Sequence, residues 1–505
     1  MKRLFRRIFH LLKIFMKSIL LSALLCFFLL GDAQTNVMLF EGPPVFHGAT
    51  VTGNYPNTEF LFTVPATGER PLKFRAEGLP KGLTIEAASG IIRGTVKEKG
   101  TYMVKVTASN AKGKAEETLK IEIGDKLCLT PPMGWNSWNV FTNTLDEKLV
   151  VEITDAMVSS GMRDLGYQYI NMDDYWHAPS RAEDGKPVAD PVKFPHGIKW
   201  LSDYVHSKGL KLGIYSDAGD KTCGKCFGGF QHEEIDAKVY AEWGVDLLKY
   251  DFCFVPFKKS EALSRYKKMG DALKSSGRSI VYSLCNWGFF RPWTWGESVG
   301  GNYWRTTPDI VDVWNGSPFW YGSFMSIMKR QTKLDKYAGP GHWNDPDMMI
   351  VGNYGQGKAT GGGGKYKGMT DLEYQTHMSL WCMLNAPLLS SCDLRSMNEP
   401  TKNILLNSEI LAISQDEKGE QAKLVSKTNG VWLFRKNLKD GSVAVAVFNT
   451  SKKEKKFDLT AKAIDLNGEF TAKDVWKHAS AGTLKESMPL TLKGHETIVL
   501  KLTKP

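Results

Sequence analysis

Acidic, amide and aromatic side chains follow short apolar segments in the middle of this 505-residue chain. Asp251 comes directly after the apolar segment 246–250, and Asp309 lies four residues after Arg305. Glycoside hydrolysis requires two carboxyl groups, one that attacks the sugar or activates water and one that protonates the leaving oxygen. Indole rings cover the apolar side of a sugar ring, while carboxylates accept hydrogen bonds from its hydroxyl groups. These residue types therefore favour chemistry on a carbohydrate.

Further candidates for contact with a sugar lie at the ends of neighbouring apolar segments. They are Trp138, Asp173, Asp174, Tyr215, Lys249, Asn286, Arg305 and Asp347. A cation at Lys249 or Arg305 would keep a nucleophilic carboxylate ionised and would also bind sugar hydroxyls. Each aspartate has an alternative interpretation as a turn or helix-capping residue, most plainly Asp345 and Asp347. Trp138 has an alternative interpretation as an ordinary core residue.

Residues 127–415 alternate between helix-like and strand-like segments, which must position these side chains. Apolar residues recur at helical spacing at Leu149, Ile153, Ala156 and Met157, and again at Ile198, Leu201 and Val205. Thr144 and Glu147 predict a capping box at the start of the first of these helices. About eight strand candidates in roughly 290 residues fit a (β/α)8 barrel, whose active site lies at the carboxyl ends of its strands.

Strand-like patterns occupy the regions on both sides of this barrel. In residues 34–126, apolar and polar residues alternate, as at 102–108, between turn-rich stretches, which predicts a β-sandwich. The stretch GLPKGLTIEAASGIIRGTVKEKGTYMVKVTASN resembles Ig-like modules attached to bacterial secreted proteins. In residues 416–505, alternating valines at 443–447 follow an Asp-Gly hairpin turn at 440–441, which predicts a second small β-domain, a C-terminal antiparallel β-sandwich.

The first 33 residues have the pattern of a secretory signal peptide. Basic residues precede an apolar run from Ser18 to Leu30, and small residues at Gly31 and Ala33 occupy the positions that a signal peptidase reads. A retained membrane anchor is the alternative, but the run is short for a helix that spans a bilayer. We therefore expect export to the periplasm or the extracellular space, with no stable membrane span after cleavage.

Charge and cysteine content argue against several other classes of protein. Cleavage after residue 33 would lower the net charge from +11 to about +6, and the remaining lysines are mixed with acidic residues. The absence of a clustered basic stripe argues against a nucleic-acid partner. Cys223-x-x-Cys226 lacks the second cysteine pair or the nearby histidines of a zinc site. We expect a carbohydrate substrate, no metal and no cofactor.

Seven motifs occur in order along the barrel region: PPMGWNSWNVF, NMDDYW, KLGIYSDAGDKTC, DLLKYDFC, SLCNWG, WRTTPDI and GPGHWNDPDMMIVGNYG. Together they resemble glycoside hydrolase family 27, the α-galactosidases of the melibiase group, over about residues 127–500. The resemblance implies a retaining α-galactosidase in which Asp251 is the nucleophile and Asp309 is the acid/base. It places the candidates named above at sugar-contacting positions, and it implies a disulfide between Cys223 and Cys253.

Asn286 departs from the family pattern, because animal and many plant members carry glutamate there, facing the 2-hydroxyl of the sugar. The bulky Phe289 and Phe290 that follow disfavour an α-N-acetylgalactosaminidase, which needs small residues beside the acetamido group. A β-L-arabinopyranosidase stays open, since its sugar matches galactose without the hydroxymethyl group. The intact pair Asp173 and Asp174 favours galactose by resemblance.

A non-catalytic carbohydrate-binding protein is the alternative from outside the enzymes, and the Ig-like region motivates it. A barrel that had lost its activity would usually have lost one of the two catalytic carboxylates. Asp251 and Asp309 are both present, which favours an enzyme.

Overall fold

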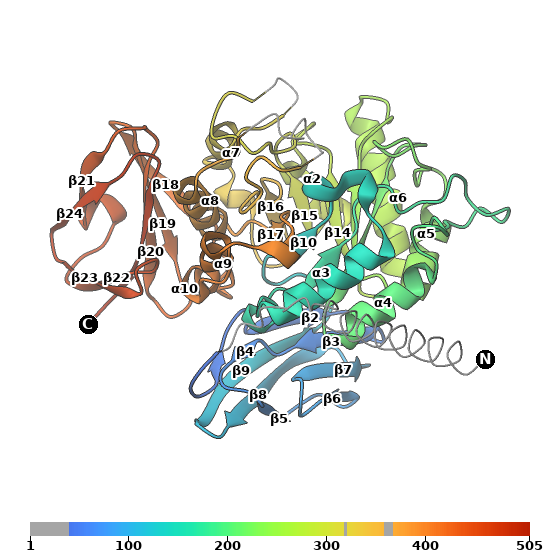
Figure 1. The fold of residues 1–505 in the computed structure, drawn as a ribbon, viewed down its shortest axis with the longest axis horizontal. Coiled ribbons are helices and arrows are strands. Elements are labelled where there is room, and N and C mark those ends of the chain that lie inside the picture. Colours follow the sequence, from blue (N-terminus) through green and yellow to red (C-terminus); the bar gives the residue numbers. More distant parts are fainter. Residues whose placement is uncertain (1–39, 318–320, 358–366) are drawn as a thin grey trace, which may run out of the picture. The chain divides into compact units, whose positions relative to one another are not determined.

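A computed structural model of the chain describes residues 40–317, 321–357 and 367–505 (Figure 1). The predicted signal peptide, residues 1–33, lies outside the described residues. Among the described residues, no helix combines the length and the apolar character needed to cross a membrane.

The N-terminal region contains two β-sheets, with strand orders β2-β9-β8-β5 and β3-β7-β6. Their bounds are β2 (Val51–Asn54), β3 (Glu59–Thr63), β5 (Lys73–Glu77), β6 (Leu83–Ile85), β7 (Ile91–Thr95), β8 (Gly100–Asn110) and β9 (Gly113–Ile123), beside the short pair β1 (Val45–Phe46) and β4 (Ala66–Thr67). Val104, Val106 and Ala108 on β8 are buried in one core with Phe62 and Ile92 of the other sheet. The predicted Ig-like β-sandwich is confirmed.

Eight parallel strands form a curled, TIM-like sheet with the order β16-β15-β14-β13-β12-β11-β10-β17. Their bounds are β10 (Met133–Asn136), β11 (Tyr169–Asn171), β12 (Lys211–Asp217), β13 (Leu247–Asp251), β14 (Val281–Cys285), β15 (Tyr303–Arg305), β16 (Trp343–Asp345) and β17 (Leu388–Ser390). A parallel bridge between Met349 and Ser390 joins the segment after β16 to β17, so the two edges of the sheet meet. The predicted barrel is confirmed.

Helices alternate with these strands along the chain. They are α2 (Trp138–Phe141), α3 (Glu147–Ser159), α4 (Gly197–Ser207), α5 (Glu233–Glu242), α6 (Lys259–Ser275), α7 (Phe324–Gln331), α8 (Asp371–Met383), α9 (Glu399–Leu405) and α10 (Ser408–Ser414). The apolar positions predicted for α3 and α4 are buried in the main core, which confirms the helical spacing.

The predicted capping box at Thr144 and Glu147 is wrong. Thr144 ends a short 3-10 turn, and Asp146 caps α3 by accepting a hydrogen bond from the backbone N–H of Leu149 at 2.7 Å. The Glu147 carboxylate instead accepts from the backbone N–H of His196 at 3.1 Å. Asp is as good an N-cap as Thr, so the residue directly before the helix takes this role.

The C-terminal region is a six-stranded antiparallel sheet of order β18-β19-β20-β25-β22-β23 with a separate pair, β21-β24. Bounds are β18 (Lys423–Thr428), β19 (Val431–Asn437), β20 (Val443–Asn449), β21 (Lys455–Thr460), β22 (Phe470–Asp474), β23 (Ala479–Leu484), β24 (Ser487–Leu492) and β25 (Thr497–Thr503). The predicted hairpin joins β19 to β20 through the turn at 440–441. The antiparallel β-domain is confirmed.

Strand β20 is buried on both of its faces. Val443, Val445 and Val447 lie in the core of the C-terminal region, whereas the alternating Ala444 and Ala446 belong to the core shared with the barrel. A strand buried on both sides needs apolar residues at every position. This requirement explains why β20 carries no polar alternation.

The Ig-like region contacts the barrel where the barrel strands begin. Thr63 donates its hydroxyl to the carbonyl oxygen of Gly209 at 2.6 Å, two residues before β12. Ser279, two residues before β14, accepts from the backbone N–H of Tyr55 at 2.9 Å. These contacts lie at the amino ends of the strands, the end of such barrels where residues serve stability.

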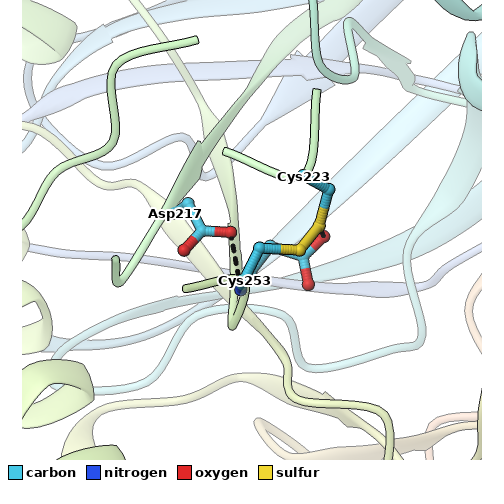
Figure 2. Close-up of side chains that lie close together, drawn as sticks. Asp217, Cys223 and Cys253 are labelled. Carbon is cyan, nitrogen blue, oxygen red and sulfur yellow. Dashed lines mark hydrogen bonds between the residues drawn. A yellow bond between two sulfur atoms is a disulfide. The ribbon is translucent and has the colours of Figure 1, made fainter. Parts of the chain in front are cut away.

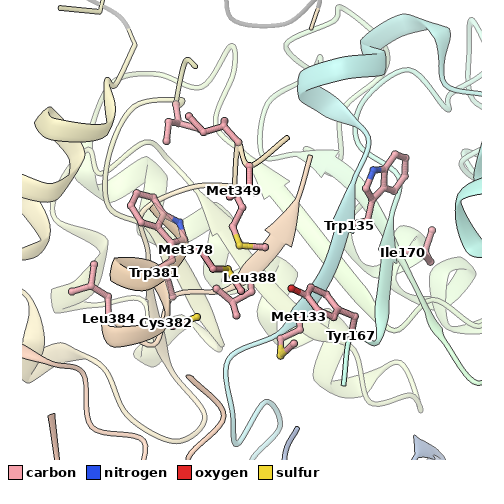
Figure 3. Close-up of a cluster of buried hydrophobic side chains, with 14 of the residues drawn as sticks. Met133, Trp135, Tyr167, Ile170, Met349, Met378, Trp381, Cys382, Leu384 and Leu388 are labelled. Atoms are coloured by element: carbon pink, nitrogen blue, oxygen red, sulfur yellow. The ribbon is translucent and has the colours of Figure 1, made fainter. Parts of the chain in front are cut away.

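The main core joins strands β10, β11 and β17 to helix α8 (Figure 3). Trp135 and Ile170 lie on neighbouring strands, and Met378 and Trp381 come from α8. All four side chains are fully buried. The barrel wall therefore depends on contacts between segments more than 200 residues apart in the chain.

We predict that Met378→Ala destabilises the protein by about 2–5 kcal/mol, because it deletes a fully buried side chain and leaves a cavity. Met103→Ala is the matched control, since Met103 is 60% exposed on β8 and its removal should cost less than about 0.5 kcal/mol. Differential scanning calorimetry of both variants measures the difference. Equal melting temperatures for the two variants would contradict the burial of Met378 in the main core.

Candidate active site

The polar residues predicted to bind and cleave a sugar lie at the carboxyl ends of the barrel strands. The strand ends carry Asp173 and Asp174 after β11, Tyr215 on β12, Lys249 and Asp251 on β13, Asn286 after β14, Arg305 on β15 and Asp347 after β16. Tyr215 is in register with Lys249, and Arg305 with Asp345. Because the strands are parallel, these side chains meet at one end of the barrel.

Asp251 is the last residue of β13 and is almost completely buried. The Tyr215 hydroxyl donates to Oδ2 at 3.0 Å, and the backbone N–H of Phe252 donates to Oδ1 at 2.9 Å. Burial raises the pKa of Asp251 to about 7, and the charge of Asp309 adds to this rise while Lys249 opposes it. The carboxylate is therefore held in a fixed orientation within the electrostatic field of the second carboxyl group.

Lys249 links two of the predicted site residues. Its ammonium group donates to Oδ2 of Asp173 at 2.7 Å and lies 5.2 Å from the centre of the Tyr215 ring. Burial lowers the pKa of Lys249, but the negative charges of Asp173 and Asp251 raise it by more. The pKa of Lys249 therefore lies well above its ordinary value. Asn136, which is not among the predicted site residues, donates to the same Asp173 oxygen at 2.9 Å.

Arg305 joins two carboxylates on the other side of the site. Its Nη2 lies 3.0 Å from Oδ1 of Asp309 and 2.9 Å from Oδ2 of Asp347. The guanidinium is buried, whereas the Asp309 side chain is 31% exposed. Burial raises the pKa of Asp347 to about 7, although the positive charge of Arg305 acts to lower it. Asp309 is therefore anchored at one oxygen and open to solvent.

Asp174 and Trp138 border the site near the loop after β12. Asp174 accepts from the backbone N–H groups of Tyr175 at 2.8 Å and Gly224 at 2.7 Å, and burial raises its pKa. The partly exposed Trp138 ring stacks on Tyr175 with 6.0 Å between ring centres. Trp138 is thus not fully buried in the core, and its indole belongs to an aromatic pair at the rim.

Asn286 is completely buried directly after β14. Its Nδ2 donates to the carbonyl oxygen of Phe289 at 2.6 Å. Its Oδ1 has no hydrogen-bond partner among the described residues, although a buried acceptor normally has one. The Asn286 side chain therefore has one hydrogen-bond acceptor, Oδ1, that is unused within the described part of the chain.

The implied disulfide between Cys223 and Cys253 is confirmed (Figure 2). It joins the loops that follow β12 and β13. Buried Asp217, which is in register with Asp251, accepts from the backbone N–H groups of Gly219 at 2.7 Å and Cys253 at 3.0 Å. Asp217 is not among the predicted site residues, although it lies two residues after Tyr215 and hence on the same face of β12. It positions the loop beside Asp251.

Two groups of potential metal ligands lie in the described part of the chain. One consists of Asp217, Asp251 and the two disulfide sulfurs, which cannot form thiolates. The other consists of Asp174, His177 and Cys226. Burial raises the pKa of the Cys226 thiol to about 11, so it is protonated at neutral pH and is a poor ligand. Neither group is a strong metal site.

The arrangement provides two carboxyl groups in contrasting environments. Asp251 is buried and held by Tyr215 beside a cation, whereas Asp309 is anchored by Arg305 and reaches solvent. Carboxyl groups that differ in this way can take the two separate roles that glycoside hydrolysis needs.

Comparison with known proteins gives consistent matches. The family described as "Alpha galactosidase A" matches residues 130–416, its C-terminal β-sandwich family matches residues 428–502, and a family of candidate Ig domains matches residues 43–124. The chain is 42% identical over 412 residues to an α-galactosidase of Cyamopsis tetragonoloba, covering 80% of this chain and 94% of the relative.

Two solved structures share the fold. One is a Bacteroides fragilis protein described as a candidate α-galactosidase/melibiase, with TM-score 0.89 and 46% identity over 94% of this chain and all of that one. The other is α-galactosidase I of Mortierella vinacea, with TM-score 0.70 and 35% identity over 75% of this chain and 98% of that one.

We predict that Asp251→Asn stabilises the protein at pH 8 by roughly 1–4 kcal/mol. The folded-state pKa of about 7 lies above the ordinary value near 3.8, so the folded protein holds a proton that the unfolded chain releases between about pH 4 and pH 7. The wild type therefore loses stability as the pH rises through this window, and the variant does not.

Melting temperatures at pH 5 and pH 8 test this prediction, and the gain should be smaller at pH 5. Asp203→Asn, at a carboxylate 58% exposed on α4, is the control and should show no such dependence. A variant that is less stable than the wild type at pH 8 would contradict the prediction.

Proposed function

We propose a specific activity for this chain, which belongs to the melibiase family of α-galactosidases: it is an exported retaining enzyme that removes terminal α-D-galactosyl residues from oligo- or polysaccharides. The observation that carries the proposal is the pair of carboxyl groups Asp251 and Asp309, one buried and one open to solvent, at the carboxyl ends of β13 and β15. Each provides one of the two functions that a double displacement requires.

In the first step, a carboxylate oxygen of Asp251 forms a bond to C1 of the galactosyl residue while the bond from C1 to the leaving oxygen breaks. The Tyr215 hydroxyl and the backbone N–H of Phe252 hold the carboxylate for this attack. Lys249 favours its ionised form, which is the nucleophilic one. Asp309 transfers its proton to the leaving oxygen.

In the second step, Asp309 is ionised and accepts a proton from water as the water oxygen bonds to C1. The ester to Asp251 breaks, and two inversions give net retention. Arg305 contacts Asp309 through one oxygen at 3.0 Å, which leaves the other oxygen for proton transfer. The two carboxyl groups perform every proton and nucleophile role, so the proposal requires no cofactor.

Recognition of galactose uses the remaining polar groups of the site. Asp173 and Asp174 would accept hydrogen bonds from the 4- and 6-hydroxyls, and Lys249 and Arg305 would donate to sugar oxygens. The free acceptor of Asn286 suits the 2-hydroxyl. Trp138, stacked on Tyr175, would cover the apolar side of the ring, and Asp347 would contact the sugar beside Arg305.

Export to the periplasm or the extracellular space rests on the signal-peptide pattern of residues 1–33. The disulfide between Cys223 and Cys253 supports this proposal, because such bonds persist in oxidising compartments.

We predict that Asp251→Ala lowers kcat on p-nitrophenyl α-D-galactoside by at least about a thousandfold, because no intermediate ester can form.

Asp309→Ala should lose far more activity on a galactosyl disaccharide than on the aryl galactoside, whose good leaving group needs no proton. Asp203→Ala, an exposed aspartate on α4, is the control. NMR of wild-type hydrolysis should show the α-anomer of galactose first. A wild-type rate in Asp251→Ala, or the β-anomer first, would refute the mechanism.

We predict that the enzyme prefers an aryl α-D-galactoside to the matching β-L-arabinopyranoside and α-N-acetylgalactosaminide. The Asp173 and Asp174 pair suits the 4- and 6-hydroxyls, and the bulk of Phe289 and Phe290 opposes an acetamido group. Comparison of kcat/KM on the three aryl glycosides measures the preference. Binding of galactosides by calorimetry without any product would instead favour a carbohydrate-binding protein.

A further inference from the structure

The backbone beside the proposed acid/base is fixed by two hydrogen bonds. The carbonyl oxygen of Asp309 accepts from the backbone N–H of Gly322 at 2.7 Å. Buried Ile310 donates its backbone N–H to Oδ2 of Asp347 at 2.7 Å. We call residues 309–314 the acid/base segment. Contacts that hold this segment set the position from which the Asp309 carboxyl group reaches a leaving oxygen.

Asp312 ties the acid/base segment to helix α8. Its buried carboxylate accepts from the backbone N–H groups of Gly355 at 2.8 Å and Met369 at 3.0 Å, and from the Tyr374 hydroxyl at 2.6 Å. Tyr374 belongs to α8, and Met369 lies two residues before this helix. A buried polar group whose hydrogen bonds are satisfied makes its surroundings rigid. The acid/base segment is therefore attached to the start of α8.

Trp314 brings the acid/base segment into contact with the C-terminal region. Its indole stacks on the His495 imidazole, with 4.0 Å between ring centres and 15° between ring planes. The indole also stacks on Phe324 of α7 at 4.6 Å and meets Phe448 of β20 edge-on at 5.8 Å. Aromatic pairs of these kinds stabilise a structure beyond the area that they bury. Two side chains of the C-terminal region thus support the segment that carries Asp309.

His495 is itself held by α8. It lies in the turn between β24 and β25, and its Nδ1 is 2.6 Å from Oε1 of Glu373 in the first turn of α8. The Thr376 hydroxyl donates to the carbonyl oxygen of His495 at 2.7 Å. The His495 side chain is only 12% exposed. The imidazole therefore has a fixed place between α8 and the Trp314 indole.

We propose that His495 is a positioning residue for the acid/base, so that the C-terminal β-domain sets the orientation of Asp309 through Trp314. This inference rests on the proposed function. Loss of the imidazole would remove one stacking partner of Trp314 and let the acid/base segment move. Proton transfer to the leaving oxygen requires close alignment of the acid, so it would slow. The bond from Asp251 to C1 would form as before when the leaving group needs no proton.

The test compares two substrates that differ in their need for the acid. Methyl α-D-galactoside releases methanol, which must be protonated as it leaves, whereas p-nitrophenyl α-D-galactoside releases an anion that needs no proton. The ratio of kcat/KM for the methyl to that for the aryl galactoside does not depend on the amount of folded enzyme. We expect His495→Ala to lower this ratio about tenfold, which is part of the roughly 100- to 10,000-fold that a general acid contributes.

Two further variants separate the ring from the contact with Glu373. His495→Phe keeps a flat ring against Trp314 and should retain the wild-type ratio. His495→Gln keeps a polar group for Glu373 but no ring, and it should lower the ratio. His478→Ala is the matched control and should retain the ratio. Like His495, His478 has a positive φ, and its Nδ1 lies 2.8 Å from a glutamate, but this is Glu409 of α10.

Each outcome separates the two proposals. Wild-type protein that hydrolyses neither substrate refutes the proposed function and this inference with it. An active wild type whose ratio is unchanged in His495→Ala and His495→Gln overturns the positioning role alone, because equal losses on both substrates would mean that His495 only stabilises the fold. A ratio in His495→Phe as low as that in His495→Ala overturns the route through Trp314. A lowered ratio in His478→Ala also overturns the inference, because any loosening of the C-terminal region would then suffice.

Discussion

The site depends on the balance of buried charge around Asp251. Two cations, Lys249 and Arg305, lie among five carboxyl groups, those of Asp173, Asp251, Asp309, Asp345 and Asp347. Burial raises the pKa of Asp251 and Asp347 to about 7, and the cations limit this rise. Because the carboxyl groups outnumber the cations, some of them can be ionised and others protonated near neutral pH. Glycoside hydrolysis needs both forms, since a nucleophile must be ionised and a general acid must be protonated.

The fold separates this site from the contacts that stabilise it. Parallel register brings the carboxyl ends of all eight strands together, while Ser279 and Gly209, at the amino ends, bind the Ig-like region. Arg278 adds an ion pair to Glu59 of that region at 2.6 Å. The contacts with the Ig-like region therefore lie at the opposite ends of the strands from the buried carboxylates. The Ig-like region contacts the barrel away from the proposed chemistry.

Sequence patterns predicted those parts of the molecule that depend on local periodicity or on family motifs. The strand ending at Asp251, the helix with Ile153 and the disulfide at Cys223 were all predictable in this way. The cap of α3 was not, because Thr144 and Asp146 both suit an N-cap, and in the structure Thr144 belongs to the preceding 3-10 turn while Asp146 caps the helix. The contacts of Asp217 and Asn136 depend on neighbouring strands, which one sequence does not place.

The strained loops after β13 and β14 are held by contacts within the barrel region itself. Phe254 and Phe290 have left-handed backbone conformations that bulky residues rarely adopt. Phe290 packs against Phe252 and accepts a hydrogen bond at its carbonyl oxygen from the Trp295 indole at 3.0 Å, and the disulfide at Cys253 adjoins Phe254. Phe252 and Cys253 directly follow Asp251 in the chain. The contacts that hold the loop after β13 therefore also fix the backbone at the proposed nucleophile, so that its carboxylate is positioned before a sugar binds.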